Sequence, residues 1–396
     1  MISKERENFA ALFAVTMKRH ETLPLEMTEA RAVTDGLWEL LRPAAMRERP
    51  VPERHRLIFY LGHLEAFDWN LIGRRGLGER SFHPAFDQLF EFGIDPPMGE
   101  LPQDGPGDWP AEAEIQAYNQ RTRETIDRLV THAPPEMVEA AIEHRLMHAE
   151  TLTYLIHNLP YTDKVRVEAR GLVSGGRARL ASPLEVPAGV ATLGKSVDEA
   201  FGWDNEFGQH RVAVPAFRCA REKVTHGEYL QYVEDGGAVP HFWRQEAGRW
   251  CYRGMFELQP MPMDAPVYVT QRQAMDYAKW RGQTLLTEAQ FHRLADDLPQ
   301  LPGNYDFATW DPVAVSSTGP LIGNGWEWTR TPFAPFAGFA PLPFYPTYSA
   351  DFFDGEHYVL KGASPRTAKR FLRPSFRNWF RADYPYAYAS FRVVEK

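Results

Sequence analysis

Two histidines four residues apart, His144 and His148, stand in the stretch EHRLMHAETLTYLIH, which otherwise has the pattern of a packed helix. The apolar positions of this segment recur every three or four residues, and both histidines fall among them: Met137, Ala141, His144, His148, Leu152 and Leu155. A buried imidazole needs a hydrogen-bond partner or a metal, and two imidazoles one helical turn apart can share one ion. The pattern predicts a metal site; two separately hydrogen-bonded core histidines are the alternative.

A third ligand must come from another helix, and His63 in FYLGHLEAFDWN is the best candidate. It lies on an apolar stripe with Phe59, Ala66 and Phe67 at helical spacing. Metal sites in helix bundles are built from inward side chains of facing helices. Five other histidines lie in loops or off these stripes and are not expected to ligate: His20, His55, His83, His132 and His157.

Three neutral nitrogen ligands on one face leave up to three open positions on an octahedral ion. Iron(II) oxygen chemistry needs such open positions, although a carboxylate usually replaces one histidine. Zinc with three histidines and a water is the alternative metal. The segment is not a zinc-protease motif, because HRLMH has Arg145 where that motif needs its general-base glutamate.

The elements that must position these ligands are helices in the first 160 residues. Apolar periodicity predicts them at roughly 4–20, 26–43, 53–74, 110–131 and 135–157. Between 81 and 110 lies a Pro/Gly segment for which no secondary structure is predicted. An insertion of that length in a compact domain is usually functional or covers something.

After Pro160 the pattern changes to short alternating strands and glycine turns, beginning with VRVEARGLVSGGRARLASPLEVPAGVATLG. One clear helix interrupts them, TQRQAMDYAKWRG, with Thr270 as N-cap and Gly282 as C-cap. We therefore expect an α+β chain with a helical domain at 1–160, a linker with first strands at 161–185, and a second domain at 186–396.

Composition narrows the class of protein. The 396 residues carry a formal net charge of -8 without a basic block, which disfavours nucleic acid or an anionic membrane as partner. Two cysteines, Cys219 and Cys251, cannot build a disulfide framework. The N-terminal stretch is charged from residue 4, and no apolar run is long enough to span a bilayer. A cytoplasmic protein is expected.

The second half resembles a known family. GNGWEWTRTPF at 323–333 is similar to the GNVWEWT signature of the formylglycine-generating-enzyme, or sulfatase-modifying-factor, domain, whose fold is C-type-lectin-like. Further segments match that pattern in order over about 180–396: FGWDNE, VTHGEYLQYVEDGG, APVYVTQRQAMDYAKWRGQTLLTEAQF and the terminal FRNWFRADYPYAYASFRVV. Formylglycine generators bind copper through two cysteines near the C-terminal end. Because no cysteine follows Cys251, that activity is not expected.

The first half, with GHLEAFDW and HRLMHAET, resembles a DinB-type four-helix bundle. A DinB-type bundle fused to such a domain is the architecture of the ergothioneine-biosynthesis sulfoxide synthases. The resemblance implies that His63, His144 and His148 hold one non-haem iron(II) and that dioxygen is a co-substrate. It also implies that the enzyme joins sulfur to the imidazole ring of hercynine, the trimethyl betaine of histidine.

The substrate motifs depart from that family. Its HEQQH is HRLMH here, with Met147 in place of the hercynine-contacting glutamine, and its RNWD is RNWF, with Asn378 kept and Phe380 replacing the aspartate. A trimethylammonium has no N–H, and aromatic faces can hold it for about 1–2 kcal/mol per contact. The predicted hercynine-binding residues are Met147, Asn378, Trp379, Phe380, Tyr384 and Tyr386. Rings that merely form the core are the alternative.

The family also uses a tyrosine near the iron to steer the reaction toward the sulfoxide. Tyr345 and Tyr348 in PFYPTYSADFF are the nearest candidates for this catalytic role.

The donor site shows a further departure. The family grips the carboxylates of γ-glutamylcysteine with arginines, but residues 81–120 contain no lysine or arginine. They do contain eight acidic residues: Asp87, Glu91, Asp95, Glu100, Asp104, Asp108, Glu112 and Glu114. An acidic lip is a poor receptor for an anionic dipeptide. The favoured prediction is therefore the selenoneine synthase branch, with a selenosugar as donor. A thiol donor such as γ-glutamylcysteine or cysteine is the alternative, and a non-catalytic lectin-like binding module is a different class.

Overall fold

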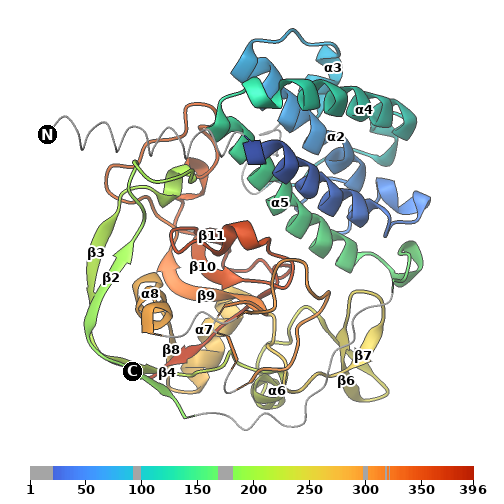
Figure 1. Cartoon of the computed structure of the whole chain (residues 1–396). Helices are drawn as coiled ribbons and strands as arrows, with labels where there is room; N and C mark the ends of the chain where they lie inside the picture. Colours follow the sequence, from blue (N-terminus) through green and yellow to red (C-terminus); the bar gives the residue numbers. More distant parts are fainter. Residues whose placement is uncertain (1–20, 92–99, 168–181, 298–301, 317–318, 321) are drawn as a thin grey trace, which may run out of the picture. The chain divides into compact units, whose positions relative to one another are not determined.

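The computed structural model describes residues 21–91, 100–167, 182–297, 302–316, 319–320 and 322–396. The helix expected at 4–20 and most of the strands expected over 165–181 lie outside these residues. The chain divides into two compact units, Met1–Arg166 and Val167–Lys396. Helices dominate the first unit and short strands the second, so the predicted mixture of helix and strand is confirmed (Figure 1).

Long helices build the first unit. Residues 21–38 are helical, followed by α2 (Leu57–Asp68), α4 (Glu112–Leu129) and α5 (Pro135–Asn158). The helices predicted near these positions are confirmed, although the first of them ends at residue 38 rather than 43. Pro135 occupies the first turn of α5, where its missing N–H costs nothing, and Leu159 caps the other end just before Pro160. Helix α2 packs against both α4 and α5 (Figure 1).

Helix α2 does not end at Asp68 but continues as a π-helix, η2 (Trp69–Gly76). A π-helical turn is rare and often marks a functional site. Gly73 allows this turn to close, because a Cβ there would lie 2.4 Å from the ring of Trp69.

The 81–110 segment was expected to lack secondary structure, and that expectation is wrong for part of it. It contains the helix α3 (Pro84–Leu89) and the single turn η3 (Pro106–Asp108). Asp87 is buried in α3 and accepts hydrogen bonds from Trp69 Nε1 at 3.2 Å and Tyr118 Oη at 2.8 Å. These tertiary contacts fold a stretch whose composition predicts only a loop.

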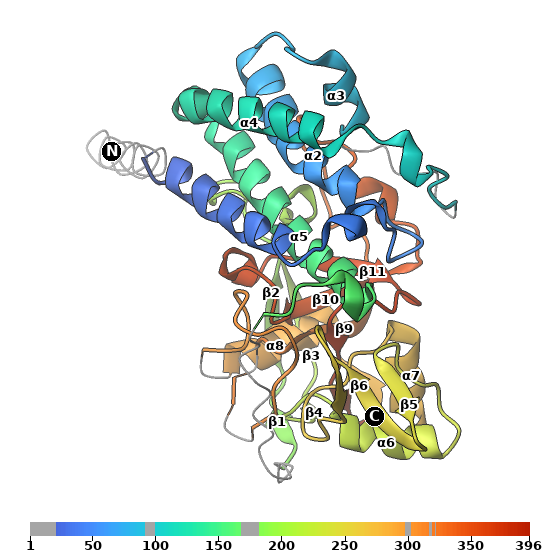
Figure 2. The same ribbon diagram turned by 90° about the vertical axis from the view of Figure 1, so that its right-hand side faces the viewer.

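Short strands build the second unit, and its described residues form two four-stranded sheets and two smaller ones. The first sheet has the order β1 (Leu184–Val186), β4 (Phe217–Cys219), β13 (Val393–Val394), β8 (Thr284–Leu285). The second has the order β11 (Asn378–Arg381), β10 (His357–Ala363), β9 (Gly325–Pro332), β12 (Ala389–Ser390). One smaller sheet pairs β2 (Gly189–Leu193) with β3 (His210–Val214) (Figure 2). The other has the order β5 (Trp243–Glu246), β6 (Arg249–Arg253), β7 (Leu258–Pro260).

Three helices accompany these sheets: α6 (His226–Glu234), α7 (Gln271–Trp280) and α8 (Glu288–Asp297). Thr270 is the N-cap of α7 as predicted, and its hydroxyl accepts a hydrogen bond from the N–H of Gln273. The C-cap is Arg281 rather than Gly282, which follows it with a φ of 71° that suits glycine. In the described residues, no helix combines the length and apolar character that crossing a membrane requires.

The GNGWEWTRTPF motif forms β9 and is part of the core. Trp328 Nε1 donates to the carbonyl of Val269 at 2.8 Å, and buried Glu327 pairs with Arg392 at 2.8 Å. Lys223 Nζ donates to the carbonyl of Gly325 at 2.6 Å. The motif therefore stabilises the fold of the second unit.

Candidate metal centre

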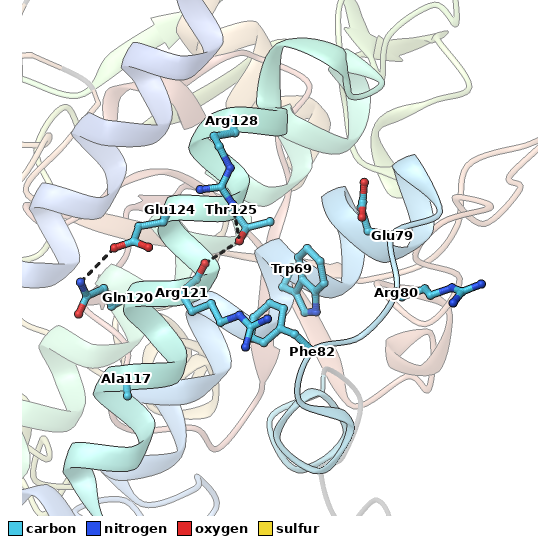
Figure 3. A pocket seen from close by; sticks show the side chains of 10 residues that line it. All are labelled: Trp69, Glu79, Arg80, Phe82, Ala117, Gln120, Arg121, Glu124, Thr125 and Arg128. Carbon is cyan, nitrogen blue, oxygen red and sulfur yellow. Dashed lines mark hydrogen bonds between the residues drawn. The ribbon is translucent and has the colours of Figure 1, made fainter.

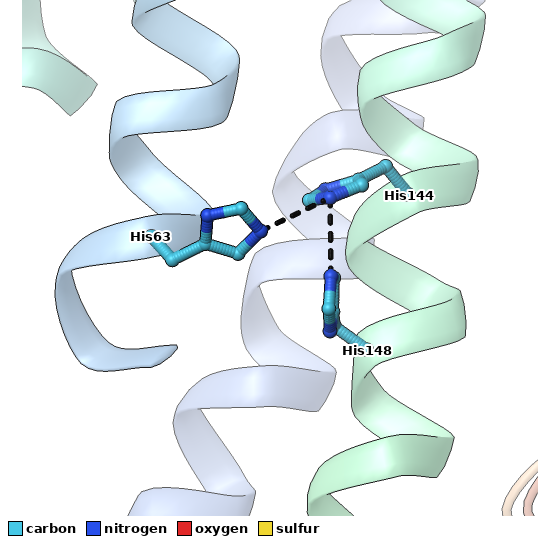
Figure 4. A group of neighbouring side chains, drawn as sticks. All are labelled: His63, His144 and His148. Atoms are coloured by element: carbon cyan, nitrogen blue, oxygen red, sulfur yellow. Dashed lines mark hydrogen bonds between the residues drawn. The ribbon is translucent and has the colours of Figure 1, made fainter. Parts of the chain in front are cut away.

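Three histidine side chains converge in the helical unit: His63 from α2, and His144 and His148 from α5 (Figure 4). The Nε2 atom of His144 lies 3.3 Å from that of His63 and 3.1 Å from that of His148. His63 and His144 are each 4% exposed, and His148 is partly exposed. The structure thus brings together all three of the predicted metal ligands.

The spacing of these nitrogens fits one shared ion. Ligands about 2.1 Å from a metal lie about 3.0 Å apart at right angles and about 3.4 Å apart in a tetrahedron. The two observed separations, 3.1 and 3.3 Å, fall in this interval. A proton can join two facing imidazole nitrogens, but one proton cannot serve three of them. The donor set therefore suits a divalent ion with open positions.

The protonation state of the cluster also suits metal binding. Burial lowers the pKa of His144 well below its ordinary value of 6.5, and the neighbouring His148, His63 and Arg145 lower it further. The imidazole is therefore neutral at pH 7, which is the form that ligates a metal.

A backbone carbonyl of the 81–110 segment orients His63. Its Nδ1 lies 2.9 Å from the carbonyl oxygen of Phe90, so Nδ1–H donates to this oxygen and Nε2 is left as the ligand atom. Phe90 comes this close because its ring lies against Gly62, where a Cβ would be 2.7 Å from the ring. The segment after α3 thus supports a predicted metal ligand, a role that the sequence did not reveal.

An aromatic ring lies beside each of the three imidazoles. Phe59 stacks on His63 with centroids 4.8 Å apart, and Phe67 stacks on His144 at 3.5 Å. Tyr60 lies tilted against His148 at 5.5 Å. These rings restrict rotation of the imidazoles. In the sequence, the aromatic residues on both sides of His63 in FYLGHLEAF indicate that such rings lie near the imidazoles.

The predicted catalytic tyrosines lie in the second unit. Tyr348 is buried and stacks on Trp203 with centroids 3.9 Å apart, and Tyr345 lies 5.7 Å from Tyr348. The next residue, Ser349, donates to Asp204 Oδ1 at 2.5 Å, while burial raises the pKa of Asp204 to about 6. The two tyrosines are therefore parts of one packed cluster.

The predicted hercynine-binding residues do not all gather at one place. Successive residues of β11 point to opposite faces. Trp379 stacks on Phe333 at 4.3 Å and meets Tyr348 edge-on at 5.3 Å. Phe380 instead stacks on Tyr384 at 4.9 Å, and Tyr386 lies 5.2 Å from Tyr384.

Asn378 begins β11, on the same face as Phe380, and its side-chain oxygen accepts a hydrogen bond from the N–H of Trp379 at 2.9 Å. Met147 is in the other unit, partly exposed on α5 next to His148. The six predicted residues thus fall into three groups: Asn378 with Phe380, Tyr384 and Tyr386; Trp379; and Met147.

A separate hollow of about 590 Å³ lies on the helical unit (Figure 3). Its aromatic residues are Trp69 and Phe82, and Arg121 lies over the Phe82 ring at 4.4 Å. Apart from Ala117, the rest of the lining is charged or polar: Glu79, Arg80, Gln120, Glu124, Thr125 and Arg128. None of the predicted site residues lines this hollow, so the histidine cluster is the candidate centre.

Comparison with known proteins agrees with the two-domain division. The profile of the Sulfatase-modifying factor enzyme 1-like domain matches residues 170–297 and 319–396, more than half of the chain. The DinB superfamily profile matches residues 26–157. The predicted fold class, a DinB-like bundle followed by a formylglycine-generating-enzyme-type domain, is confirmed.

Curated relatives align with between 48% and 94% of the chain. Ergothioneine biosynthesis protein 1 of Schizosaccharomyces pombe is 26% identical over 94% of this chain and 57% of its own length. Hercynine oxygenase of Mycolicibacterium smegmatis is 28% identical over 93% of this chain and 96% of its own length. Hercynine oxygenase of Mycobacterium tuberculosis is 32% identical over 48% of this chain and 54% of its own length.

The chain spans little more than half the length of the fungal relatives: 57% for the S. pombe protein and 55% for that of Neurospora crassa. Among solved structures, PvdO from Pseudomonas aeruginosa is 21% identical over 54% of this chain and 94% of its own, with a TM-score of 0.41. The profile matches and their order show the family: the chain belongs to the sulfatase-modifying factor enzyme 1-like family, with a DinB-superfamily domain ahead of the matched domain.

Proposed function

We propose that the chain is a non-haem iron(II) enzyme that uses dioxygen to form a carbon–chalcogen bond on the imidazole ring of hercynine. The observation that carries this proposal is the convergence of three histidine Nε2 atoms in the helical unit. Relatives named hercynine oxygenase support hercynine as the substrate.

The ligand set favours iron over zinc for this reaction. Iron supplies one-electron chemistry with dioxygen, which zinc does not, and three protein ligands leave positions for both reactants. The chain contributes geometry: Phe90 fixes the tautomer of His63, and Phe59 and Phe67 fix ring planes. Because His148 is the most exposed of the three ligands, reactants reach the ion on its side.

For hercynine, we propose the face of β11 that carries Asn378 and Phe380. The stacked rings of Phe380 and Tyr384 are both partly exposed and present an aromatic surface to a trimethylammonium. The side-chain oxygen of Asn378 is held by the N–H of Trp379, which orients its NH₂ group to donate to the carboxylate of the betaine.

For the donor, we propose a selenosugar. The structural reason differs from the argument that the sequence offered, which was the acidic composition of residues 81–120. Two carboxylates of the 81–110 segment are paired with arginines: Asp104 with Arg49 and Arg56, and Asp87 with Arg74 at 3.8 Å. The segment is therefore less acidic in effect than its composition indicates.

Similar contacts engage several other arginines of the chain. Arg49 also donates to the carbonyl of Pro102 at 2.7 Å, and Arg47 donates to the carbonyls of Pro106 and Pro110 at 2.5 and 3.0 Å. Arg373 pairs with Glu206 at 2.5 Å. A neutral sugar needs hydroxyl partners rather than free guanidinium groups, so this arrangement favours it over γ-glutamylcysteine.

A thiol donor, γ-glutamylcysteine or cysteine, is the second candidate, and the names of the relatives favour it. The deciding experiment loads the protein with iron anaerobically, then adds hercynine, air and equal amounts of a 1-seleno-sugar and γ-glutamylcysteine. Product masses are read out. A predominant selenium product supports the selenosugar, and a predominant sulfur product rejects it. Bound iron without either product would contradict the enzyme and leave a binding module.

A further inference from the structure

A buried ion-pair cluster lies beside the metal ligands and has no part in the proposed chemistry. Arg145, next to His144 on α5, is 1% exposed. Its Nη2 atom lies 2.7 Å from Asp68 Oδ2 and 3.0 Å from Glu65 Oε2, both on α2 and both buried. We call Arg145, Glu65 and Asp68 the cluster; Arg123 on α4, which is partly exposed, also pairs with Glu65 at 2.7 Å.

The cluster joins the two helices that carry the ligands. Glu65 and Asp68 follow His63 on α2, while Arg145 lies between His144 and His148 on α5. Arg145 Nη2 also donates to the carbonyl of Leu64 at 3.1 Å. One guanidinium therefore contacts the backbone residue directly after His63 and two side chains within five residues of it. Sliding α2 along α5 would break all of these contacts together.

Stability alone does not explain these charges. Burying an ion pair costs so much hydration that apolar residues of equal volume are often as stabilising or more so. A cation beside a divalent ion also opposes metal binding, unless carboxylates offset its charge. The two carboxylates offset the charge of Arg145 here, so the cost that remains is the lost hydration of the buried ion pairs, and a role in placing the ligands accounts for it.

We propose that Arg145 is a positioning residue for the metal, which acts through Glu65 and Asp68 to hold His63 at the right height against His144 and His148. This inference rests on the proposed function, because it assumes that the three histidines bind a metal. The planar guanidinium matters because its two terminal nitrogens act at different places. Nη2 makes the three contacts with α2, while Nη1 donates to Thr34 Oγ1 at 3.3 Å. The single compact ammonium of a lysine cannot occupy both places.

The test uses the full chain and two variants. Arg145→Lys keeps the charge but loses the planar guanidinium. The triple variant Arg145→Met, Glu65→Gln, Asp68→Asn removes the charges of the cluster while keeping volume. Arg392→Lys is the matched control, because Arg392 is a 3% exposed arginine whose ion pair with buried Glu327 belongs to the second unit. Fe(II) affinity is titrated anaerobically against a competing chelator, and the visible spectrum of the Co(II) form reports ligand geometry.

Both cluster variants should bind Fe(II) roughly 10–100-fold more weakly than the wild type, with an altered Co(II) spectrum, while Arg392→Lys stays within about threefold. The triple variant should unfold at the same urea concentration as the wild type or a higher one, because a merely structural cluster would lower stability and affinity together. Cluster variants with wild-type affinity and spectrum would overturn the inference. If the triple variant does not fold, Arg145→Lys decides alone. A wild type that binds no iron would instead contradict the proposed function.

Discussion

The histidine cluster of the helical unit and the aromatic strand β11 of the second unit show how differently spacing predicts a site. His63 and His144 are 81 residues apart in sequence, yet their Nε2 atoms lie within 3.3 Å. Trp379 and Phe380 are adjacent in sequence, yet they stack on different partners, Phe333 and Tyr384. A helical period gathers residues on one face, whereas neighbours in a strand separate to two faces.

The largest expected effect tests the histidine cluster. His148→Ala should abolish bound iron and turnover, because two imidazoles are a poor site for Fe(II). The fold should survive, because His148 is partly exposed. Metal analysis and circular dichroism measure the two outcomes. His132→Ala, which removes an exposed histidine of the same unit, is the control. Full iron retention in His148→Ala would remove this residue from the site.

A smaller effect should follow from a single methyl group at Gly62. In Gly62→Ala the new Cβ would lie 2.7 Å from the Phe90 ring, which must move and carry its carbonyl away from His63. Overpacking of this kind costs about 1–3 kcal/mol, and iron affinity should fall about tenfold. Urea unfolding and iron titration measure these losses.

Gly36→Ala is the matched control, because a Cβ there meets nothing within 4 Å in the helical stretch 21–38. It should raise stability by about 0.4–1 kcal/mol and leave iron affinity alone. If both variants behave alike, the close approach of Phe90 does not support the metal site.

The next variants test the residues of β11 that lie on opposite faces of the strand. Asn378→Ala and Phe380→Ala should each weaken hercynine binding, the latter by about tenfold for a lost cation–π contact of about 1–2 kcal/mol. Trp379→Ala should lower stability more than hercynine affinity, because its ring packs against Phe333 and Tyr348. Calorimetric titration gives the affinities. Unchanged binding in both Asn378→Ala and Phe380→Ala would move the betaine pocket elsewhere.

The sequence could predict the ligands and the long helices because both follow from apolar periodicity. It could not predict Phe90, whose contribution to the site is a backbone carbonyl that every residue has. Nor could it place Asp87: in a Pro/Gly stretch an aspartate looks exposed, and only its donors Trp69 and Tyr118 explain its burial. The sequence marks Arg145 only as the residue that stands in place of the general-base glutamate of a zinc-protease motif. Its ion pairs with residues of α2 depend on the tertiary structure and could not be predicted.

The sequence could have predicted that Trp379 and Phe380 lie on opposite faces, because the two-residue period of a strand is available from the sequence alone. The prediction that both rings bind hercynine rests on the RNWF motif and does not take that period into account. A site predicted from a strand should therefore be divided by face before its residues are assigned a common ligand.

The smallest expected effect concerns buried charge, and it compares one cluster of the helical unit with one carboxylate of the second unit. Glu65 and Asp68 in the helical unit lie against Arg145, whereas in the described residues of the second unit Asp204 has no cation within ion-pair distance and bonds to Ser349 instead. Burial raises the pKa of Asp204 from 3.8 to about 6. A carboxyl whose pKa is higher in the folded state stabilises the fold below the unfolded pKa, and this contribution is lost as pH rises through the folded pKa.

Unfolding free energy should therefore fall by about 1–2 kcal/mol between pH 4 and pH 6 in the wild type relative to Asp204→Asn, somewhat less than the full shift implies because solvent screens part of it. An asparagine can still accept from Ser349, so the variant should match the wild type at pH 4 and exceed it at pH 7. Urea unfolding across this range is the measurement. Parallel pH profiles would mean that Asp204 keeps its charge in the fold, and that the second unit tolerates a buried carboxylate without the cation that the helical unit provides.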